Sequence, residues 1–240
     1  MSYEVICGDS NTILKHLPTG DLLLADPPFD EWNQFLEVIA NRQDRTLAVF
    51  TTWQHRIPIE QRLGKPKAEI IWHFGDGRWV SHNLPRLTHS SILIYGEVGD
   101  AYVGEYTPNQ KPINKGYGSV GKDKLGERMY TPRNRKLLNS VIIAPRNVSN
   151  GVWAKPAAVV RPLIEWLCPV GGLVIDPFMG RGTALISARS LKRNYIGIDI
   201  DPDCVANAEH QTESELELFP DNDPTLLWNI FGEEIRHEQT

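Results

Sequence analysis

The sequence contains few cysteines and no long apolar run, and these two absences exclude several classes of protein. Only three cysteines occur in 240 residues, and they are too scattered for a disulfide framework or a metal site. No stretch approaches the ~18 apolar residues of a membrane span. Residues 1–10 lack the basic region and apolar run of a signal peptide. We therefore expect a cytoplasmic protein without metal or membrane contacts.

The sequence has a small excess of acidic residues, but its charge is divided unevenly along the chain. The net charge is −5. Residues 201–240 carry −10, whereas residues 1–200 carry +5. Residues 109–136 contain eight basic and two acidic side chains, which is a local charge of +6. The net charge alone disfavours a nucleic-acid partner. Because clustered cations attract phosphate groups, the basic segment is nevertheless compatible with such a partner.

Short apolar runs alternate with helical patterns along most of the chain. The runs at 22–24 and 92–94 are continuously apolar, which is typical of parallel strands that helices cover on both faces. This alternation predicts an α/β protein with an open, doubly wound sheet. We predict strands at residues 4–7, 22–25, 47–50, 69–73, 91–95, 173–175 and 195–200, and helices at 12–16, 31–42, 155–167, 183–190 and 204–218.

Regular patterning disappears between about residues 98 and 149, where Gly, Pro, Asn, Lys and Arg dominate. A run of this length inside a compact domain is usually functional or disordered. We therefore expect two parts of an α/β domain, residues 1–98 and 150–212, separated by a basic insertion at 99–149. An acidic tail at 213–240 would follow.

A glycine-rich turn lies between the predicted strand at 173–175 and the predicted helix at 183–190. It reads DPFMGRGT over residues 176–183. Glycines at such a turn let the backbone approach a ligand, and the helix N-terminus offers unpaired N–H groups. The next strand ends near Asp199, where α/β nucleotide folds hold ribose hydroxyls. A tight turn followed by a surface acid has the same pattern, so these residues alone indicate a nucleoside site only weakly.

The tetrapeptide Asp26-Pro27-Pro28-Phe29 directly follows the apolar run at 22–25. Two prolines fix φ and lack N–H groups, so the chain leaves the strand along a rigid path with free carbonyls. A carboxylate and a carbonyl could accept the two hydrogens of an amino group, and an aromatic ring could stack on a flipped base. A Pro-rich turn with a buried aromatic residue fits the tetrapeptide equally well.

The order of these features is more specific than any one of them. The tetrapeptide, the basic insertion, the glycine turn and the Tyr-Ile-Gly-Ile-Asp run ending at Asp199 resemble amino-group DNA methyltransferases of the β arrangement. In that arrangement the catalytic half precedes the cofactor half. Gly8-Asp9 resembles the family's opening element, and Trp153-Ala154-Lys155-Pro156 resembles its Lys-Pro element. The resemblance covers most of the chain and implies a Rossmann-like, seven-stranded, mostly parallel sheet of the methyltransferase type.

The resemblance also implies a function and a site. Residues 1–98 would form the catalytic half, 99–149 the target-recognition insertion and 150–212 the cofactor half. The activity would be site-specific methylation of double-stranded DNA, with base flipping and a place in restriction-modification, and the chain would form homodimers. The implied catalytic residues are Asp26, Pro27, Pro28 and Phe29.

The implied cofactor is S-adenosylmethionine. Asp9 would contact its adenine, Asp199 its ribose and Lys155 its carboxylate region. The residues implied at its methionine end are Asp176, Phe178, Gly180, Gly182 and Thr183. The basic residues that could contact DNA are Lys111, Lys115, Lys122, Lys124, Arg128, Arg133, Arg135 and Lys136.

Several alternatives stay open or are disfavoured. An Asp at the first position of the tetrapeptide favours adenine N6 over cytosine N4, where Ser is more typical. Phe29 stands where the family commonly has Tyr, and residues 151–153 lack its usual His, so an inactive DNA-binding module is another alternative. A cytosine-C5 enzyme would need a nucleophilic cysteine, and none of the three follows a proline. The late position of the glycine turn disfavours protein or small-molecule methyltransferases.

Overall fold

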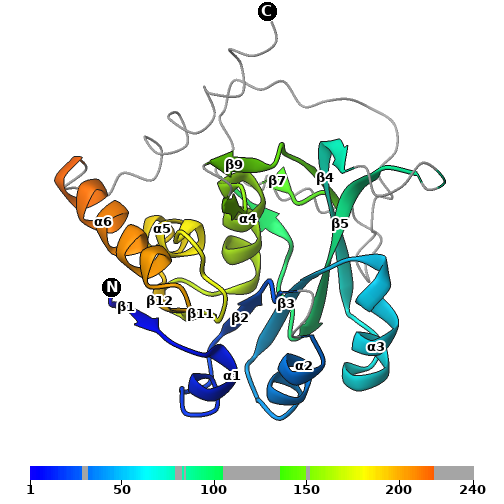
Figure 1. Cartoon of the computed structure of the whole chain (residues 1–240), viewed down its shortest axis with the longest axis horizontal. Coiled ribbons are helices and arrows are strands. Elements are labelled where there is room, and N and C mark those ends of the chain that lie inside the picture. The colour runs from blue at the N-terminus through cyan, green and yellow to red at the C-terminus, as the bar shows by residue number, and fades with distance from the viewer. Residues whose placement is uncertain (29–31, 79–82, 84, 105–135, 150–151, 219–240) are drawn as a thin grey trace, which may run out of the picture.

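The computed structural model describes residues 1–28, 32–78, 83, 85–104, 136–149 and 152–218 (Figure 1). Phe29 and most of the acidic tail lie outside the described residues. Within these ranges no helix is long and apolar enough to cross a membrane. Seven of the eight predicted DNA-contacting residues also lie outside them: Lys111, Lys115, Lys122, Lys124, Arg128, Arg133 and Arg135.

An eight-stranded sheet forms the centre of the described structure, in the order β1-β12-β11-β2-β3-β5-β4-β8. Five neighbouring pairs are parallel, whereas β5 is antiparallel to both β3 and β4. The strands are β1 (Tyr3–Cys7), β2 (Leu22–Ala25), β3 (Thr46–Thr51), β4 (Ala68–Arg78), β5 (Leu87–Gly96), β8 (Val141–Ile143), β11 (Leu173–Asp176) and β12 (Asn194–Asp199).

Two details of this sheet differ from the sequence expectations. The continuous apolar run at 92–94 belongs to β5, which is antiparallel rather than parallel; its residues are apolar because both faces of the strand are buried. The sheet also has eight strands in place of the seven that the resemblance implied, because the short strand β8 pairs with β4. Strand β8 comes from the region 99–149, so part of the expected insertion extends the central sheet.

Helices cover both faces of the sheet and give three layers (Figure 1). Leu22 and Leu24 of β2 belong to one buried cluster, and Leu23 and Ala25 belong to the other. This split follows from the pleat, which turns successive side chains to opposite faces. The first cluster packs under α4 (Ala157–Leu167), α5 (Thr183–Ser190) and α6 (Pro202–Leu218), and the second under α1 (Ser10–Ile13), α2 (Trp32–Ala40) and α3 (Trp53–Leu63).

Two short ribbons lie outside the central sheet. Strand β6 (Tyr102–Val103) pairs with β7 (Lys136–Leu137), and β9 (Asn147–Ser149) pairs with β10 (Val152–Ala154). Lys136, predicted to contact DNA, therefore lies in β7 opposite Val103. The ribbon β9–β10 directly precedes α4 and so connects the end of the region 99–149 to the cofactor half.

The order of the strands places a ligand crevice at a defined point. Strands β2 and β11 are parallel neighbours, but the chain continues from β2 toward β3 and from β11 toward β12, on opposite sides. In open α/β sheets, ligands bind outside the carboxyl ends of the strands at such a switch point. Asp26 directly follows β2, while Asp176 and Asp199 end β11 and β12. The three carboxylates therefore meet at one edge of the sheet.

Candidate active site

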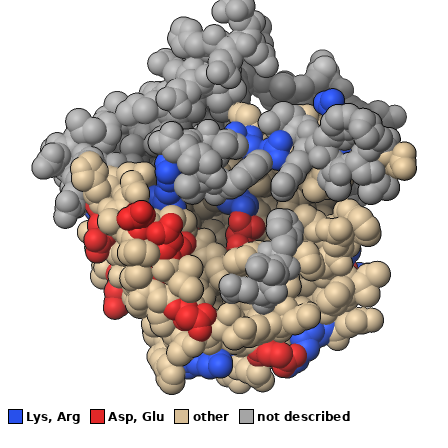
Figure 2. Space-filling model, viewed as in Figure 1, with Lys and Arg blue, Asp and Glu red and all other residues tan. Residues whose placement is uncertain are grey.

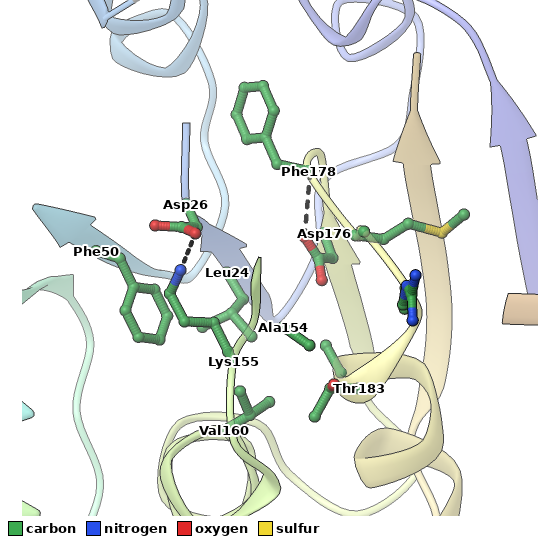
Figure 3. Close-up of a pocket in the computed structure, with 13 residues that line it drawn as sticks. Leu24, Asp26, Phe50, Ala154, Lys155, Val160, Asp176, Phe178 and Thr183 are labelled. Atoms are coloured by element: carbon green, nitrogen blue, oxygen red, sulfur yellow. Dashed lines mark hydrogen bonds and ion pairs between the residues drawn. The ribbon is translucent and has the colours of Figure 1, made fainter. Parts of the chain in front are cut away.

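Asp26 is paired with the Lys155 ammonium at the switch point. The Lys155 Nζ donates to Asp26 Oδ2, and Figure 3 shows the two side chains directed at one another. The side chains are 41% exposed for Asp26 and 22% for Lys155. Lys155 directly follows β10 and precedes Pro156, the N-cap of α4. The tetrapeptide and the Lys-Pro element are thus brought together in the fold, and the side chains of Asp26 and Lys155 contact one another directly.

Two aromatic rings flank the Lys155 ammonium. The Nζ lies 5.2 Å from the ring centroid of Phe50 and 5.7 Å from that of Trp72. Both distances fall within the range of a cation–π contact, which attracts a cation to the face of a ring. Phe50 comes from β3 and Trp72 from β4. The ammonium therefore contacts the Asp26 carboxylate, which follows β2, and one aromatic ring from each of β3 and β4.

Asp176 is a buried carboxyl group behind the glycine turn. Its Oδ2 accepts a hydrogen bond from the Tyr195 hydroxyl at 3.1 Å, and its Oδ1 accepts one from the Phe178 N–H at 3.2 Å. Burial raises the pKa of Asp176 to about 7. Burial also raises the pKa of Tyr195 well above its ordinary value. The Asp176 carboxyl group therefore titrates near neutral pH, whereas an exposed aspartate titrates near pH 4.

The glycine turn is tied to the end of β12. The Gly180 N–H donates to Asp199 Oδ2 at 2.8 Å, and the Asp201 N–H donates to Oδ1 at 3.0 Å. Gly182 adopts a left-handed conformation with φ 85° as the N-cap of α5. A Cβ on Gly182 would lie 2.9 Å from the Cβ of Ala208 in α6, so a side chain does not fit there. The turn is thus fixed close to the sheet and its neighbouring helices.

Asp9 closes the site on the β1 side. It is the N-cap of α1 and accepts hydrogen bonds from the Asn11 N–H at 3.1 Å and the Thr12 hydroxyl at 2.5 Å. The Thr12 hydroxyl is the main reason why the pKa of Asp9 lies below its ordinary value. The next residue, Ser10, donates its hydroxyl to the Pro177 carbonyl. This bond ties the Gly-Asp element to the glycine turn, and no sequence motif signals it.

A cavity of about 450 Å³ connects most of these residues. Its volume lies within the range of small-molecule sites. The face in Figure 2 is hollowed near its centre, where acidic and basic side chains meet. Seven of the predicted site residues line the cavity: Asp9, Asp26, Pro27, Pro28, Lys155, Phe178 and Asp199.

A second cavity of about 50 Å³ adjoins the first, since Asp26, Lys155 and Phe178 line both. Asp176, Gly180 and Thr183 also line this smaller cavity. Figure 3 shows it between the end of β2 and the glycine turn. Among the described residues, those of the two cavities included, no group of three His, Cys, Asp or Glu side chains is arranged to hold a metal ion.

The opposite wall of the larger cavity was not predicted. It contains Trp72 and Phe74 of β4, His89 of β5 and Arg146, which directly precedes β9. The two aromatic rings pack edge to face with centroids 5.3 Å apart, and the Arg146 guanidinium lies 4.6 Å from the Phe74 centroid. The Trp72 Nε1 donates to the Ala144 carbonyl at 2.8 Å. Trp72 and Phe74 are two residues apart in the sequence, and this spacing indicates that they lie on the same face of a strand. It was the sequence signal that could have predicted this wall.

Known proteins resemble the chain over most of its length. The type II methyltransferase M.ScaI of Streptomyces caespitosus is 36% identical over 87% of this chain and 80% of its own. The type II methyltransferase M.HpaI of Haemophilus parainfluenzae is 25% identical over 94% of this chain and 79% of its own.

Solved structures share the fold. PvuII DNA methyltransferase, described as cytosine-N4-specific, aligns with a TM-score of 0.63 at 14% identity, over 97% of this chain and 92% of its own. The M1.HpyAVI–SAM complex aligns with a TM-score of 0.58 at 18% identity, over 87% and 98%.

A family comparison matches residues 28–210 to the DNA methylases that modify N6 or N4 amino groups. The match contains the glycine turn, Asp199, Lys155 and the aromatic wall of the larger cavity, and it begins two residues after Asp26. The chain therefore belongs to this DNA methylase family, as an amino-methyltransferase of DNA whose cofactor is S-adenosylmethionine.

Proposed function

We propose that this protein methylates N6 of adenine in double-stranded DNA and that Asp26 positions the target amine. The observation that supports this proposal is the location of Asp26. Its carboxylate lies at the switch point and lines the cavity between the glycine turn on one side and the aromatic wall on the other. A base and a cofactor could thus approach the same carboxylate from opposite sides. An Asp at the start of the tetrapeptide favours adenine over cytosine.

The residues on the β11, β12 and β1 side fit S-adenosylmethionine. Asp199 and Asp9 offer carboxylates at the ends of neighbouring strands, which suits hydroxyl and amino groups of a nucleoside. A Cβ on Gly180 would meet no atom within 4 Å, so the space above the turn is open to a ligand. The remaining residues that would hold the methionine end are Asp176, Phe178 and Thr183. When bound, the cofactor supplies a methyl group on a sulfonium sulfur.

The residues of this chain would prepare the target amine for attack. Asp26 would accept a hydrogen bond from one N–H of the amine, and the carbonyl of Pro27 or Pro28 would accept a hydrogen bond from the other N–H. These two bonds would turn the nitrogen lone pair toward the methyl group. The prolines donate no competing hydrogen bonds and hold this backbone in an extended path. Trp72 and Phe74 form part of the cavity wall that a base removed from its stack could contact. Catalysis would then arise mainly from orientation.

The nature of the product tests the proposal directly. The protein is incubated with DNA and labelled S-adenosylmethionine, and the DNA is then digested to nucleosides. We expect label in N6-methyl-2′-deoxyadenosine. Label in N4-methyl-2′-deoxycytidine would instead identify cytosine as the target base, and absence of label with retained DNA binding would identify an inactive module.

Asp26→Ala tests the assigned role within the same assay. We expect methyl transfer to disappear while the Kd for S-adenosylmethionine, measured by calorimetry, stays within about threefold, because the carboxylate acts on the target amine. Glu4→Gln, an exchange on the exposed surface of β1, is the matched control. Methyl transfer by the Asp26→Ala variant at the wild-type rate would refute the mechanism. The homodimer implied by the resemblance stays a prediction that light scattering can test.

A further inference from the structure

We propose that Lys155 is a positioning residue that orients the Asp26 carboxylate for the target amine, rather than a ligand of the cofactor's carboxylate. This role rests on the proposed function, because it concerns the group that would receive the amine. Its basis is the arrangement around the ammonium: Asp26 on one side, with the Phe50 and Trp72 rings flanking it.

The main chain of Lys155 is well anchored. Pro156 follows it as the N-cap of α4, with φ −62° and ψ 140°. Val159 and Val160 in the first turn of α4 are buried in the cluster beneath the sheet. Because its backbone is already ordered, Lys155 loses only side-chain conformational entropy when its ammonium is held in one place, whereas a lysine on a mobile loop would also lose backbone entropy. The surroundings of the ammonium are also fixed, because the Trp72 ring is held by its hydrogen bond to the Ala144 carbonyl.

The ion pair has a geometric consequence for Asp26. The carboxylate is 41% exposed, so without a partner it could rotate about its Cβ–Cγ bond. A charge-assisted bond from Nζ to Oδ2 fixes that rotation and occupies one oxygen. The other oxygen, Oδ1, is left to accept a hydrogen from the amine. Lys155 therefore fixes the orientation of the carboxylate plane and so the direction in which the free oxygen faces the reacting nitrogen.

Charge distinguishes this role from that of a cofactor ligand. The sulfonium and the ammonium of the cofactor are both positive and would be repelled by a nearby lysine, whereas its carboxylate would be attracted. If Lys155 holds Asp26, removal of its charge leaves cofactor affinity unchanged or improves it. If Lys155 instead binds the cofactor's carboxylate, removal of its charge weakens that affinity. The two roles thus predict opposite results for one variant.

The test compares Lys155→Met and Lys155→Arg with the wild-type protein. Single-turnover methyl transfer is measured at saturating DNA and S-adenosylmethionine, and the Kd for S-adenosylmethionine is measured by calorimetry. For Lys155→Met we expect the rate to fall roughly 30-fold to 100-fold, since misplacement of a reacting group costs this much. Its Kd should stay within about threefold of wild type or decrease. Lys155→Arg keeps the charge and should recover the rate to within about tenfold of wild type.

Two further variants separate positioning from general damage. Phe50→Leu removes one ring beside the ammonium, and we expect a rate loss of about threefold to tenfold with an unchanged Kd. Lys15→Met removes an exposed lysine and should leave both quantities unchanged. Thermal unfolding of each variant verifies that the fold is intact.

Two outcomes would overturn the role of Lys155. The first is a Lys155→Met variant that reacts at the wild-type rate. The second is a loss confined to cofactor affinity, with a Kd raised more than about tenfold and a normal rate at saturation. A wild-type protein that transfers no methyl group to DNA would refute the proposed function itself, so the two failures are distinguishable.

Discussion

At the scale of single residues, Asp176 combines burial with a carboxyl group. It is 6% exposed, and burial raises its pKa from 3.8 to about 7. The carboxylates of Asp26 and Asp199 act in the same direction, while the hydrogen bonds from Phe178 and Tyr195 oppose the shift. The proton on Asp176 is therefore coupled to folding, and this coupling gives a measurable dependence of stability on pH.

Asp176→Asn should remove that dependence. In the unfolded chain Asp176 titrates near 3.8, so between this pH and about 7 the folded state binds more protons than the unfolded state. The stabilising contribution of the protonated group is complete below pH 4 and is lost as the pH rises through 7. We expect the free energy of unfolding of the variant, relative to wild type, to rise by roughly 1–3 kcal/mol between pH 4 and 8.

Urea unfolding at a series of pH values measures this difference. Glu4→Gln provides a matched control, because its exposed side chain lies away from Asp176 at the other end of β1 from the site. The control should follow the wild-type profile. If the profile of Asp176→Asn is also parallel to wild type at every pH, burial of the carboxyl group does not set its proton affinity.

At the scale of structural elements, the turn between β11 and α5 depends on two glycines in different ways. Both have positive φ, 52° for Gly180 and 85° for Gly182. A Cβ on Gly182 would contact Ala208 at 2.9 Å, whereas a Cβ on Gly180 would meet nothing within 4 Å. We expect Gly180→Ala to cost about 1 kcal/mol of stability and Gly182→Ala about 2 kcal/mol or more. Chemical denaturation measures both costs, and equal values would show that α6 moves away freely.

Elements with a strong local pattern could be predicted from the sequence. Strand β2 and helix α5 have the predicted bounds, because a bounded apolar run and a glycine turn before a helical pattern are local signals. Helix α3 was missed, since it contains Pro58, which usually ends a helix, and Ile59 is its one buried residue. Trp53 and Ile57 of α3 are 70% and 66% exposed, so the helix lacks an apolar stripe. Only contacts with the rest of the fold determine such an element.

At the scale of the whole molecule, the order of motifs predicted which segments meet but not which atoms. The apolar run before Asp26 and the run before the glycine turn were each predicted as a strand, and in the structure they pair directly as β2 and β11. The bond between Lys155 and Asp26 spans 129 residues, and no local pattern encodes it. The wall that contains Phe74 and Arg146 joins β4 to a segment from the region without regular patterning. These contacts depend on tertiary packing.

The charge distribution of the whole chain leads to a prediction about DNA affinity. Residues 109–136 carry a local charge of +6 in a protein whose net charge is −5, so binding should depend on this segment. Each phosphate neutralised by a basic side chain contributes about −0.9 to the slope of log K against log salt concentration. If Arg133 and Arg135 contact phosphates, their joint exchange to Ala should make the slope shallower by about 1.8. Fluorescence anisotropy with labelled duplex DNA at several salt concentrations measures the slope.

The size of the change also shows what kind of contact these arginines make. A phosphate contact lowers affinity for every DNA sequence alike, whereas a contact with a base edge lowers affinity for the recognition site alone and changes the salt slope little. The Lys15→Ala variant, with an exposed lysine removed from the part of the chain outside the insertion, should keep the wild-type slope. An unchanged slope in the double variant, with unchanged affinity for every duplex, would place the DNA on another surface. That surface would then have to bring the target base to Asp26 without help from the basic segment.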